Sequence, residues 1–153
     1  MKLAHKLGIV VGVLIALVLL LLPTRGSSEQ FQKFGDVTVH YNALSSDQLP
    51  PDVAKSYGFA RSSHKGLLNI AVQKDNGTPS PQPLAATVKA TATNLVGQRV
   101  EVSVREIRDG DAIYYLGEFP VAGTDTLRFA VEVTPQGASA PLKLAFSKDY
   151  VTD

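Results

Sequence analysis

The sequence contains no cysteine, which excludes disulfide bonds, thiolate metal sites, a cysteine nucleophile and a lipid anchor attached to cysteine. Histidine is also scarce, because only His40 and His64 follow residue 28. Zinc needs three or four convergent ligands, and the chain offers no closely spaced pair of them. We therefore expect neither a metal site nor a cofactor.

An excess of basic charge is also missing. Three of the 15 basic residues, Lys2, Lys6 and Arg25, precede residue 29, so the rest of the chain carries 12 basic and 14 acidic side chains. A nucleic-acid-binding domain normally carries a basic excess that displaces counterions from phosphates. The sequence therefore predicts no nucleic-acid partner.

One long apolar run is present, an uncharged stretch at residues 7–22 that Pro23 ends. A signal peptide has an apolar core of about 7–15 residues, whereas a membrane-spanning helix needs about 20. This N-terminal hydrophobic helix fits either role. Residues 1–28 are a signal peptide cleaved near Ser28, or an uncleaved anchor whose residues 7–22 make the only membrane contact. Both readings place residues 29–153 outside the cytoplasm, in the periplasm, as one domain.

Apolar and polar residues alternate along most of that domain, with the period of two that is typical of half-buried strands. No long amphipathic helix separates these segments, so a parallel sheet with helical crossovers is excluded. The pattern predicts an all-β fold, an antiparallel sandwich of the immunoglobulin-like or fibronectin-like kind, with a small β-barrel as the alternative. About seven strands are predicted, at residues 31–44, 67–74, 84–95, 100–105, 112–121, 127–133 and 142–146.

One short helix is predicted at about residues 51–57. Pro51 suits the first helical position, and Gly58 suits the left-handed residue that follows a helix. Val53 and Tyr57 lie four residues apart, so both would face the core. We therefore take Tyr57 as a candidate pocket residue.

Several strand-like segments resemble a family of small exported proteobacterial proteins that is known only as a domain of unknown function. The resemblance implies a periplasmic single-domain protein over most of residues 29–153, and it supplies no catalytic residue. The segments that carry it are Phe34-Gly35-Asp36, Val39-His40-Tyr41-Asn42-Ala43-Leu44, Tyr57-Gly58 with Arg61-Ser62, and Leu67-Leu68-Asn69-Ile70-Ala71-Val72.

Catalytic motifs are hard to find in this sequence. It has no Gly-x-Ser-x-Gly elbow. Ser63 and His64 are neighbours, but groups that act together in catalysis usually converge from separate elements. Paired carboxylates for glycoside hydrolysis are not suggested either, because the strand glutamates fit positions that face water. We predict no catalytic residue and no enzymatic activity, and an unrecognised hydrolase is the least favoured function.

One loop concentrates positive charge, at Arg61, His64 and Lys65. Such a loop is a candidate site for an anion or for a protein partner. The leading hypothesis is a non-enzymatic binding or assembly module of the cell envelope, with an envelope protein as its partner. A periplasmic small-ligand carrier or sensor is the alternative.

Overall fold

The computed structural model describes residues 30–152. The predicted leader, including its cleavage or anchoring, lies outside these residues. Among the described residues, no helix has both the length and the apolar character needed to cross a membrane.

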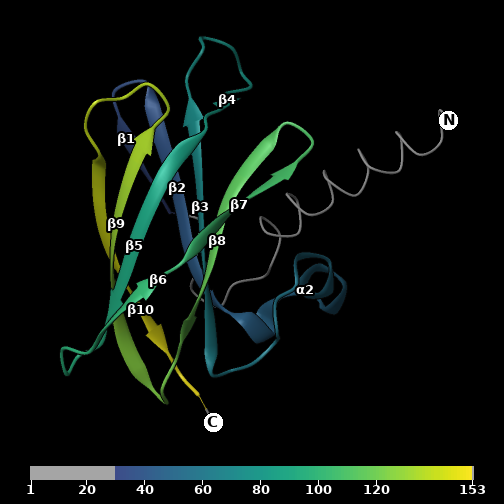
Figure 1. Ribbon diagram of the computed structural model, residues 1–153, viewed down its shortest axis with the longest axis vertical. Coiled ribbons are helices and arrows are strands. Elements are labelled where there is room, and N and C mark those ends of the chain that lie inside the picture. Colours follow the sequence, from purple (N-terminus) through teal and green to yellow (C-terminus); the bar gives the residue numbers. More distant parts are fainter. Residues whose placement is uncertain (1–29, 153) are drawn as a thin grey trace, which may run out of the picture.

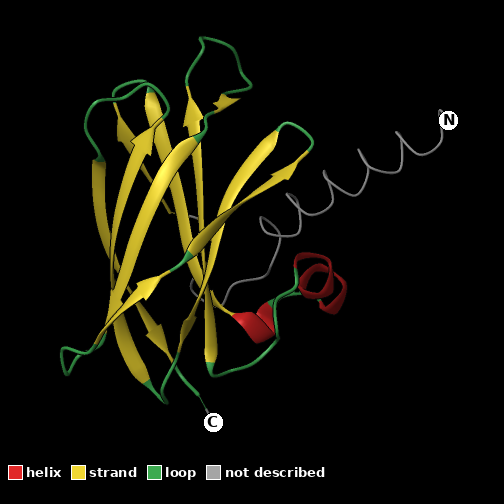
Figure 2. Cartoon of the chain, viewed as in Figure 1, coloured by secondary structure: helices red, strands yellow, loops and turns green. Residues whose placement is uncertain are grey.

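The domain is a sandwich of two antiparallel sheets, with its helices on one side (Figures 1 and 2). The first sheet, here sheet A, has the order β1-β2-β3-β8-β7, with β4 paired to β3, and sheet B has the order β10-β9-β5-β6. Sheet A contains β1 (Gln30–Phe34), β2 (Val37–Ser45), β3 (Lys65–Lys74), β4 (Gln82–Pro83), β7 (Val104–Asp109) and β8 (Ala112–Pro120). Sheet B contains β5 (Ala86–Thr93), β6 (Arg99–Val102), β9 (Asp125–Pro135) and β10 (Leu142–Tyr150).

The core lies between the sheets and follows from the alternation in the sequence. In β9, buried residues alternate with more exposed ones along the strand. Aromatic rings fill the centre, where Phe129 stacks on Phe146 with centroids 4.8 Å apart and meets Phe119 edge-on at 5.0 Å. The predicted sandwich is confirmed. The barrel alternative is wrong for the described strands, because β1 and β10 each pair on one side only.

The structure has ten strands instead of about seven, because two predicted segments divide and β4 adds a short strand. Residues 31–44 form the hairpin β1–β2, which turns at Gly35 (φ 64°) and Asp36. Residues 99–109 begin in sheet B as β6, pass Ser103 and continue in sheet A as β7. This crossing needs a very small neighbour, since a Cβ on Gly117 would lie 2.9 Å from the Ser103 carbonyl oxygen.

The predicted helix is confirmed as α2 (Pro51–Tyr57), with proline at its start and Gly58 in the left-handed conformation (φ 71°) after it. A 3-10 turn, η1 (Ser46–Gln48), precedes it. Together these segments cover part of the outer face of sheet A and form a second apolar core there. Its buried members are Leu44, Leu49, Val53, Ala54, Phe59, Leu67 and Leu116.

Candidate functional site

Arg105 of β7 connects sheet A to the C-terminal end of helix α2 through two contacts. The guanidinium carbon of Arg105 lies 4.5 Å from the centroid of the Phe59 ring, a cation–π contact. The same guanidinium donates a hydrogen bond to the carbonyl of Tyr57, the last residue of the helix. A cation at this position also offsets the negative end of the helix dipole.

Tyr57, the candidate pocket residue, contributes to the same attachment. Its hydroxyl donates a hydrogen bond to a carboxylate oxygen of Asp109 at 3.3 Å. Burial raises the pKa of Tyr57 to about 12, and the charge of Asp109 and this hydrogen bond add to the effect. Tyr57 therefore joins α2 to the end of β7.

A cavity of about 340 Å³ lies beside the end of α2, close to the predicted pocket. Tyr57 does not line it. Its polar groups come from Ser103, Arg105 and Glu118, and Phe59 gives it an aromatic wall. The Lys65 ammonium lies 4.0 Å from a carboxylate oxygen of Glu118. The cavity therefore carries charges of both signs.

The three basic residues of the predicted loop lie near one another in sequence but make separate contacts. Arg61 donates a hydrogen bond to the backbone carbonyl of Asp47 at 2.6 Å. His64 is exposed, and its carbonyl accepts a hydrogen bond from the backbone amide of Val121 at 2.9 Å. Since Lys65 pairs with Glu118, the side chains of two of these three residues contact other parts of the domain.

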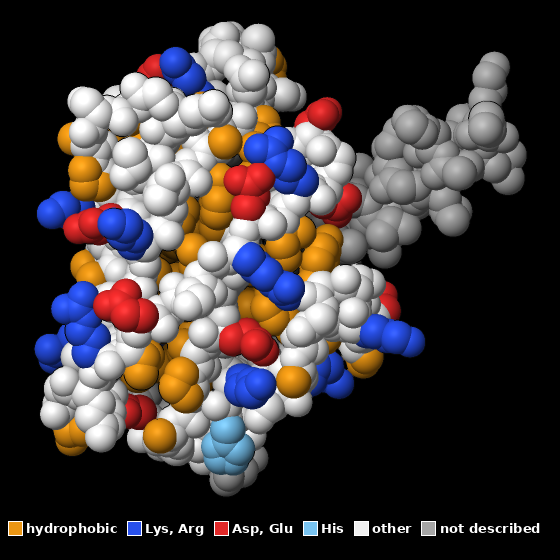
Figure 3. Space-filling view, viewed as in Figure 1, with side chains coloured by type: hydrophobic (Ala, Val, Ile, Leu, Met, Phe, Trp, Pro, Cys, Tyr) orange, Lys and Arg blue, Asp and Glu red, His pale blue; other side chains and the backbone are white. Residues whose placement is uncertain are grey.

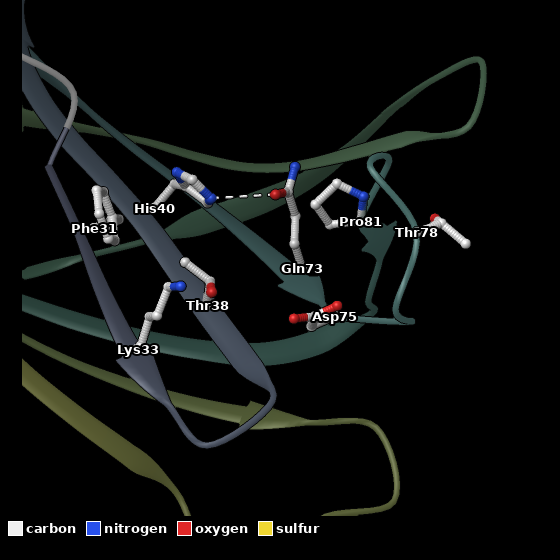
Figure 4. A pocket seen from close by; sticks show the side chains of 8 residues that line it. All are labelled: Phe31, Lys33, Thr38, His40, Gln73, Asp75, Thr78 and Pro81. Atoms are coloured by element: carbon white, nitrogen blue, oxygen red, sulfur yellow. Dashed lines mark hydrogen bonds between the residues drawn. The ribbon is translucent and has the colours of Figure 1, made fainter.

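A second cavity, of about 290 Å³, opens at the other end of the same face of sheet A (Figure 4). The β1–β2 hairpin forms one wall, and the loop after β3 forms the other. We call it the His40 groove. Its lining residues are Phe31, Lys33, Thr38, His40, Gln73, Asp75, Thr78 and Pro81.

The His40 groove combines an aromatic surface with polar groups. The Nε2 atom of His40 lies 3.1 Å from Oε1 of Gln73, and the His40 ring lies 5.9 Å from that of Phe31. Phe31 is 57% exposed, which is unusual for so large an apolar side chain. Figure 4 shows Lys33 extending toward Thr38, with Asp75 beyond it at the foot of the loop. The groove can therefore contact an apolar group and charges of both signs.

The alternation of residues 31–44 puts His40 on the polar side of its strand, and it gives no sign of the groove. The groove exists because β1 folds back on β2, which puts Phe31 opposite His40 in the register. The loop is held in place by the backbone amide of Asp75, which donates to the Asp36 carbonyl at 2.8 Å. The prolines at residues 79, 81 and 83 favour a stiff, extended connection, but no local signal shows where it lies.

On the face in Figure 3, acidic and basic side chains are interspersed rather than gathered by sign. Over residues 30–152, no three His, Asp or Glu side chains converge as metal ligands would.

These features define a two-sheet β-sandwich domain with two polar cavities on the outer face of one sheet. The chain belongs to the DUF4426 family, a domain of unknown function, whose model matches residues 31–153. A solved structure of a DUF4426 family protein (PA0388) from Pseudomonas aeruginosa PAO1 is 33% identical, with a TM-score of 0.70. The alignment covers 82% of this chain and 96% of that one.

Two structures of FetP from uropathogenic Escherichia coli are also similar, at 12% and 13% identity, each with a TM-score of 0.58. They cover 81% and 82% of this chain, and 94% and 96% of their own. One FetP was expressed recombinantly in the periplasm, and the other is a copper-bound variant. At this identity the likeness shows the fold alone. A comparison with curated proteins finds no match.

Proposed function

We propose that this protein is a non-enzymatic binding module of the bacterial cell envelope and that it binds a protein partner through the His40 groove. The observation that carries the proposal is the groove itself. Sheet A and the loop after β3 place an exposed aromatic ring, a cation, a carboxylate and an imidazole around one cavity of about 290 Å³.

Export is part of the proposal and rests on the N-terminal sequence. The apolar run at residues 7–22, preceded by Lys2 and Lys6, would direct the domain to the periplasm. Expression of FetP in the periplasm supports this location by analogy of fold. Cleavage near Ser28 would release the domain, whereas an uncleaved leader would hold it at the inner membrane.

A protein partner suits the groove better than a small molecule does. Protein interfaces favour an aromatic anchor surrounded by a polar rim. Phe31 supplies the anchor, and Lys33 and Asp75 supply a rim of both signs. The groove lies open between a hairpin and a loop, so an extended surface can reach it.

Photo-cross-linking in living cells tests this function. A photoreactive amino acid at Thr38 or Thr78, inside the groove, is expected to capture a discrete envelope protein. The same residue at Thr91, on the outer face of sheet B, is the control and is expected to capture none. Lys33→Glu should reduce capture, whereas Lys89→Glu on sheet B should not. Capture from Thr91 alone, or capture insensitive to Lys33→Glu, would contradict the proposal.

A small-ligand carrier is the second candidate function, and the cavity beside α2 favours it. That cavity is about 340 Å³ and carries Arg105 and Glu118, which suit a polar ligand. Native mass spectrometry of protein purified from cells should then show a copurified mass that Arg105→Ala removes. Bare protein in every preparation would count against it. Copper is not part of this proposal, since no set of three ligands converges in the described residues.

A further inference from the structure

The turn between β5 and β6 exposes two large apolar side chains that are neighbours in the sequence, the only such pair over residues 30–152. Leu95 is 61% exposed and Val96 is 81% exposed. Exposed aliphatic residues are normal when they are scattered singly, whereas adjacent ones mark a surface that contacts something else. The two side chains form the tip of a hairpin, at the end of the sandwich where the C-terminus lies (Figure 1).

Polar groups, and not these apolar side chains, hold the turn in its shape. The Asn94 amide donates a hydrogen bond to the Gln98 carbonyl at 2.9 Å, and the Gln98 amide donates to Oδ1 of Asn94 at 2.8 Å. The Asn94 side-chain amide also donates to Oε1 of Gln98 at 2.8 Å. Since these bonds close the turn, Leu95 and Val96 are not needed to stabilise it.

Two arginines stand directly behind the apolar tip, on the outer face of sheet B. Thr93, the last residue of β5, lies opposite Arg99 of β6 on one side and opposite Arg128 of β9 on the other. Residues that lie directly opposite each other point to the same face of a sheet. Both arginines are exposed. The tip therefore combines apolar side chains with two guanidinium groups one residue behind them.

These guanidinium groups are available to an anionic ligand. No residue in the range 30–152 forms an ion pair with Arg128. Arg99 lies 3.7 Å from a carboxylate oxygen of Glu101, but both side chains are exposed, and such a pair contributes little. The carboxylates of Asp125 and Asp149 at this end each accept a hydrogen bond from Thr126.

The direction of β1 relates this end of the sandwich to the predicted membrane anchor. β1 begins at Gln30 and runs toward the β1–β2 turn, away from the end that carries Leu95 and Val96 (Figure 1). Seven residues separate the apolar run, which ends at Leu22, from Gln30. Seven residues span at most about 25 Å. An uncleaved leader would therefore keep this end of the domain within reach of the bilayer.

We propose that the β5–β6 turn docks on an anionic phospholipid surface, with Leu95 and Val96 inserted at the boundary between head groups and acyl chains. Arg99 and Arg128 then bind lipid phosphates, which guanidinium groups can hold with two parallel hydrogen bonds. Apolar insertion and attraction to anionic lipids add together in binding of this kind.

A bilayer suits this surface better than a protein does, because the tip is convex. A fluid bilayer opens around an inserted side chain, whereas a protein partner would have to supply a cavity of matching shape. The turn lies at the opposite end of the domain from the His40 groove, so the inference goes beyond the function proposed above. It also adds a membrane contact to the one expected at residues 7–22.

Tryptophan fluorescence tests the insertion, because the chain has no tryptophan of its own. The full chain is reconstituted with vesicles of phosphatidylethanolamine and phosphatidylglycerol, with and without brominated acyl chains, which quench tryptophan on contact. Val96→Trp should show blue-shifted emission that the brominated lipid quenches. Ala138→Trp, in the exposed turn at the other end of the sandwich, is the control and should show neither.

A second substitution at the tip checks that insertion depends on apolar contact. Adding Leu95→Ser to Val96→Trp should reduce the quenching by about half or more, since it removes apolar area from the inserted surface. Leu95 is exposed, so the fold does not depend on it. No quenching at residue 96, or equal quenching at residues 96 and 138, would overturn the proposal.

Lipid charge and Arg128 test the second half of the proposal. Replacing phosphatidylglycerol with phosphatidylcholine, or introducing Arg128→Glu, should each reduce the quenching of Val96→Trp by about half or more. Lys89→Glu, farther from the tip on the same face of sheet B, is the matched control and should leave it unchanged. Quenching that depends on neither lipid charge nor Arg128 would contradict the proposed phosphate contacts.

A protein partner at the tip is the competing outcome. A photoreactive amino acid at Val96 in living cells should label lipid, and capture of a discrete protein from this position would overturn the proposal. Lys33→Glu should leave the quenching of Val96→Trp unchanged, which keeps this test independent of the groove.

Discussion

Gly66 of β3 faces the ring of Phe119 so closely that a Cβ on residue 66 would lie 2.0 Å from the nearest ring carbon. Gly66→Ala must therefore push the Phe119 ring against Phe129 and Tyr150, which contact it edge-on. We expect the free energy of unfolding to fall by about 1–3 kcal/mol, as is usual for an overpacked core. Urea denaturation of the wild type and the variant measures the difference.

A second substitution separates this clash from other effects of alanine. Phe119→Leu removes the ring, so adding Gly66→Ala to it should cost much less than it costs in the wild type. If Gly66→Ala lowers the free energy of unfolding equally in the wild type and in Phe119→Leu, a clash with the Phe119 ring is not the cause.

Local signals made part of this fold predictable. Helix α2 begins and ends where Pro51 and Gly58 place it, because proline and left-handed glycine act on the backbone at their own positions. The strands also followed from alternation. However, Val102 and Val104 continue the same alternation although one belongs to sheet B and the other to sheet A. The change of sheet depends on their neighbours, Ala90 and Gly117, which the pattern does not reveal.

The candidate sites were harder to predict, since each joins residues far apart in the chain. Lys33 and Asp75 line one groove only because β1 pairs with β2 and the loop after β3 folds toward that hairpin. The alternation of residues 100–105 makes Arg105 an exposed strand residue, as it is in the structure, but its contact with Phe59 depends on where α2 packs. Cross-strand and helix–sheet neighbours of this kind leave no trace in a single sequence.

Arg105 should matter for the attachment of α2 more than for the stability of the sandwich. Arg105→Ala removes the cation–π contact with Phe59 and the hydrogen bond to the Tyr57 carbonyl. We expect faster hydrogen exchange of the amides in residues 51–59, with exchange in β9 unchanged. Arg99→Ala is the control, because its ion pair with Glu101 is exposed, and it should change neither. Uniformly faster exchange in Arg105→Ala would mean that α2 has no separate attachment.

Because the pKa of Tyr57 is raised, we expect the free energy of unfolding to fall in alkaline solution. Burial, and then Asp109, raise the pKa of Tyr57 to about 12 in the folded chain, whereas an unfolded tyrosine has a pKa of about 10. The folded state therefore keeps this proton up to a higher pH than the unfolded state does. The stability that results is complete below pH 10 and is lost as the pH rises from about 10 to 12.

Tyrosinate absorbance can follow this titration, because the chain has five tyrosines and no tryptophan. Tyr57→Phe should remove one late-titrating group and flatten the decline of unfolding free energy between pH 10 and 12. Asp109→Asn should lower the pKa of Tyr57 only in part, since burial is the larger cause. If the unfolding free energy of Tyr57→Phe declines with pH as steeply as that of the wild type, the decline comes from Tyr115 and Tyr150 instead. Burial also raises the pKa values of these two tyrosines.

Ser46 is completely buried although it stands in a polar run of the sequence. Its hydroxyl lies 2.9 Å from the Ala60 carbonyl and 3.1 Å from the Ser62 carbonyl, and it accepts the Ser62 amide at 3.0 Å. Ser46→Ala leaves these backbone groups without their partner, so we expect about 1–3 kcal/mol less unfolding free energy. Ser56→Ala, whose hydroxyl is exposed on α2, is the control and should stay within about 0.5 kcal/mol.

The same substitution should also affect the basic loop, because Ser46 bonds to the backbone of Ser62, which lies between Arg61 and His64. In Ser46→Ala, the NMR amide signals of residues 60–65 should broaden or shift, while those of β9 and β10 stay in place. The alanine substitution leaves the side chains of Arg61, His64 and Lys65 intact, so any anion or partner that needs them in a fixed arrangement should bind more weakly. Unchanged signals at residues 60–65 would show that the backbone contacts of Val121 and Lys65 hold this loop without the serine.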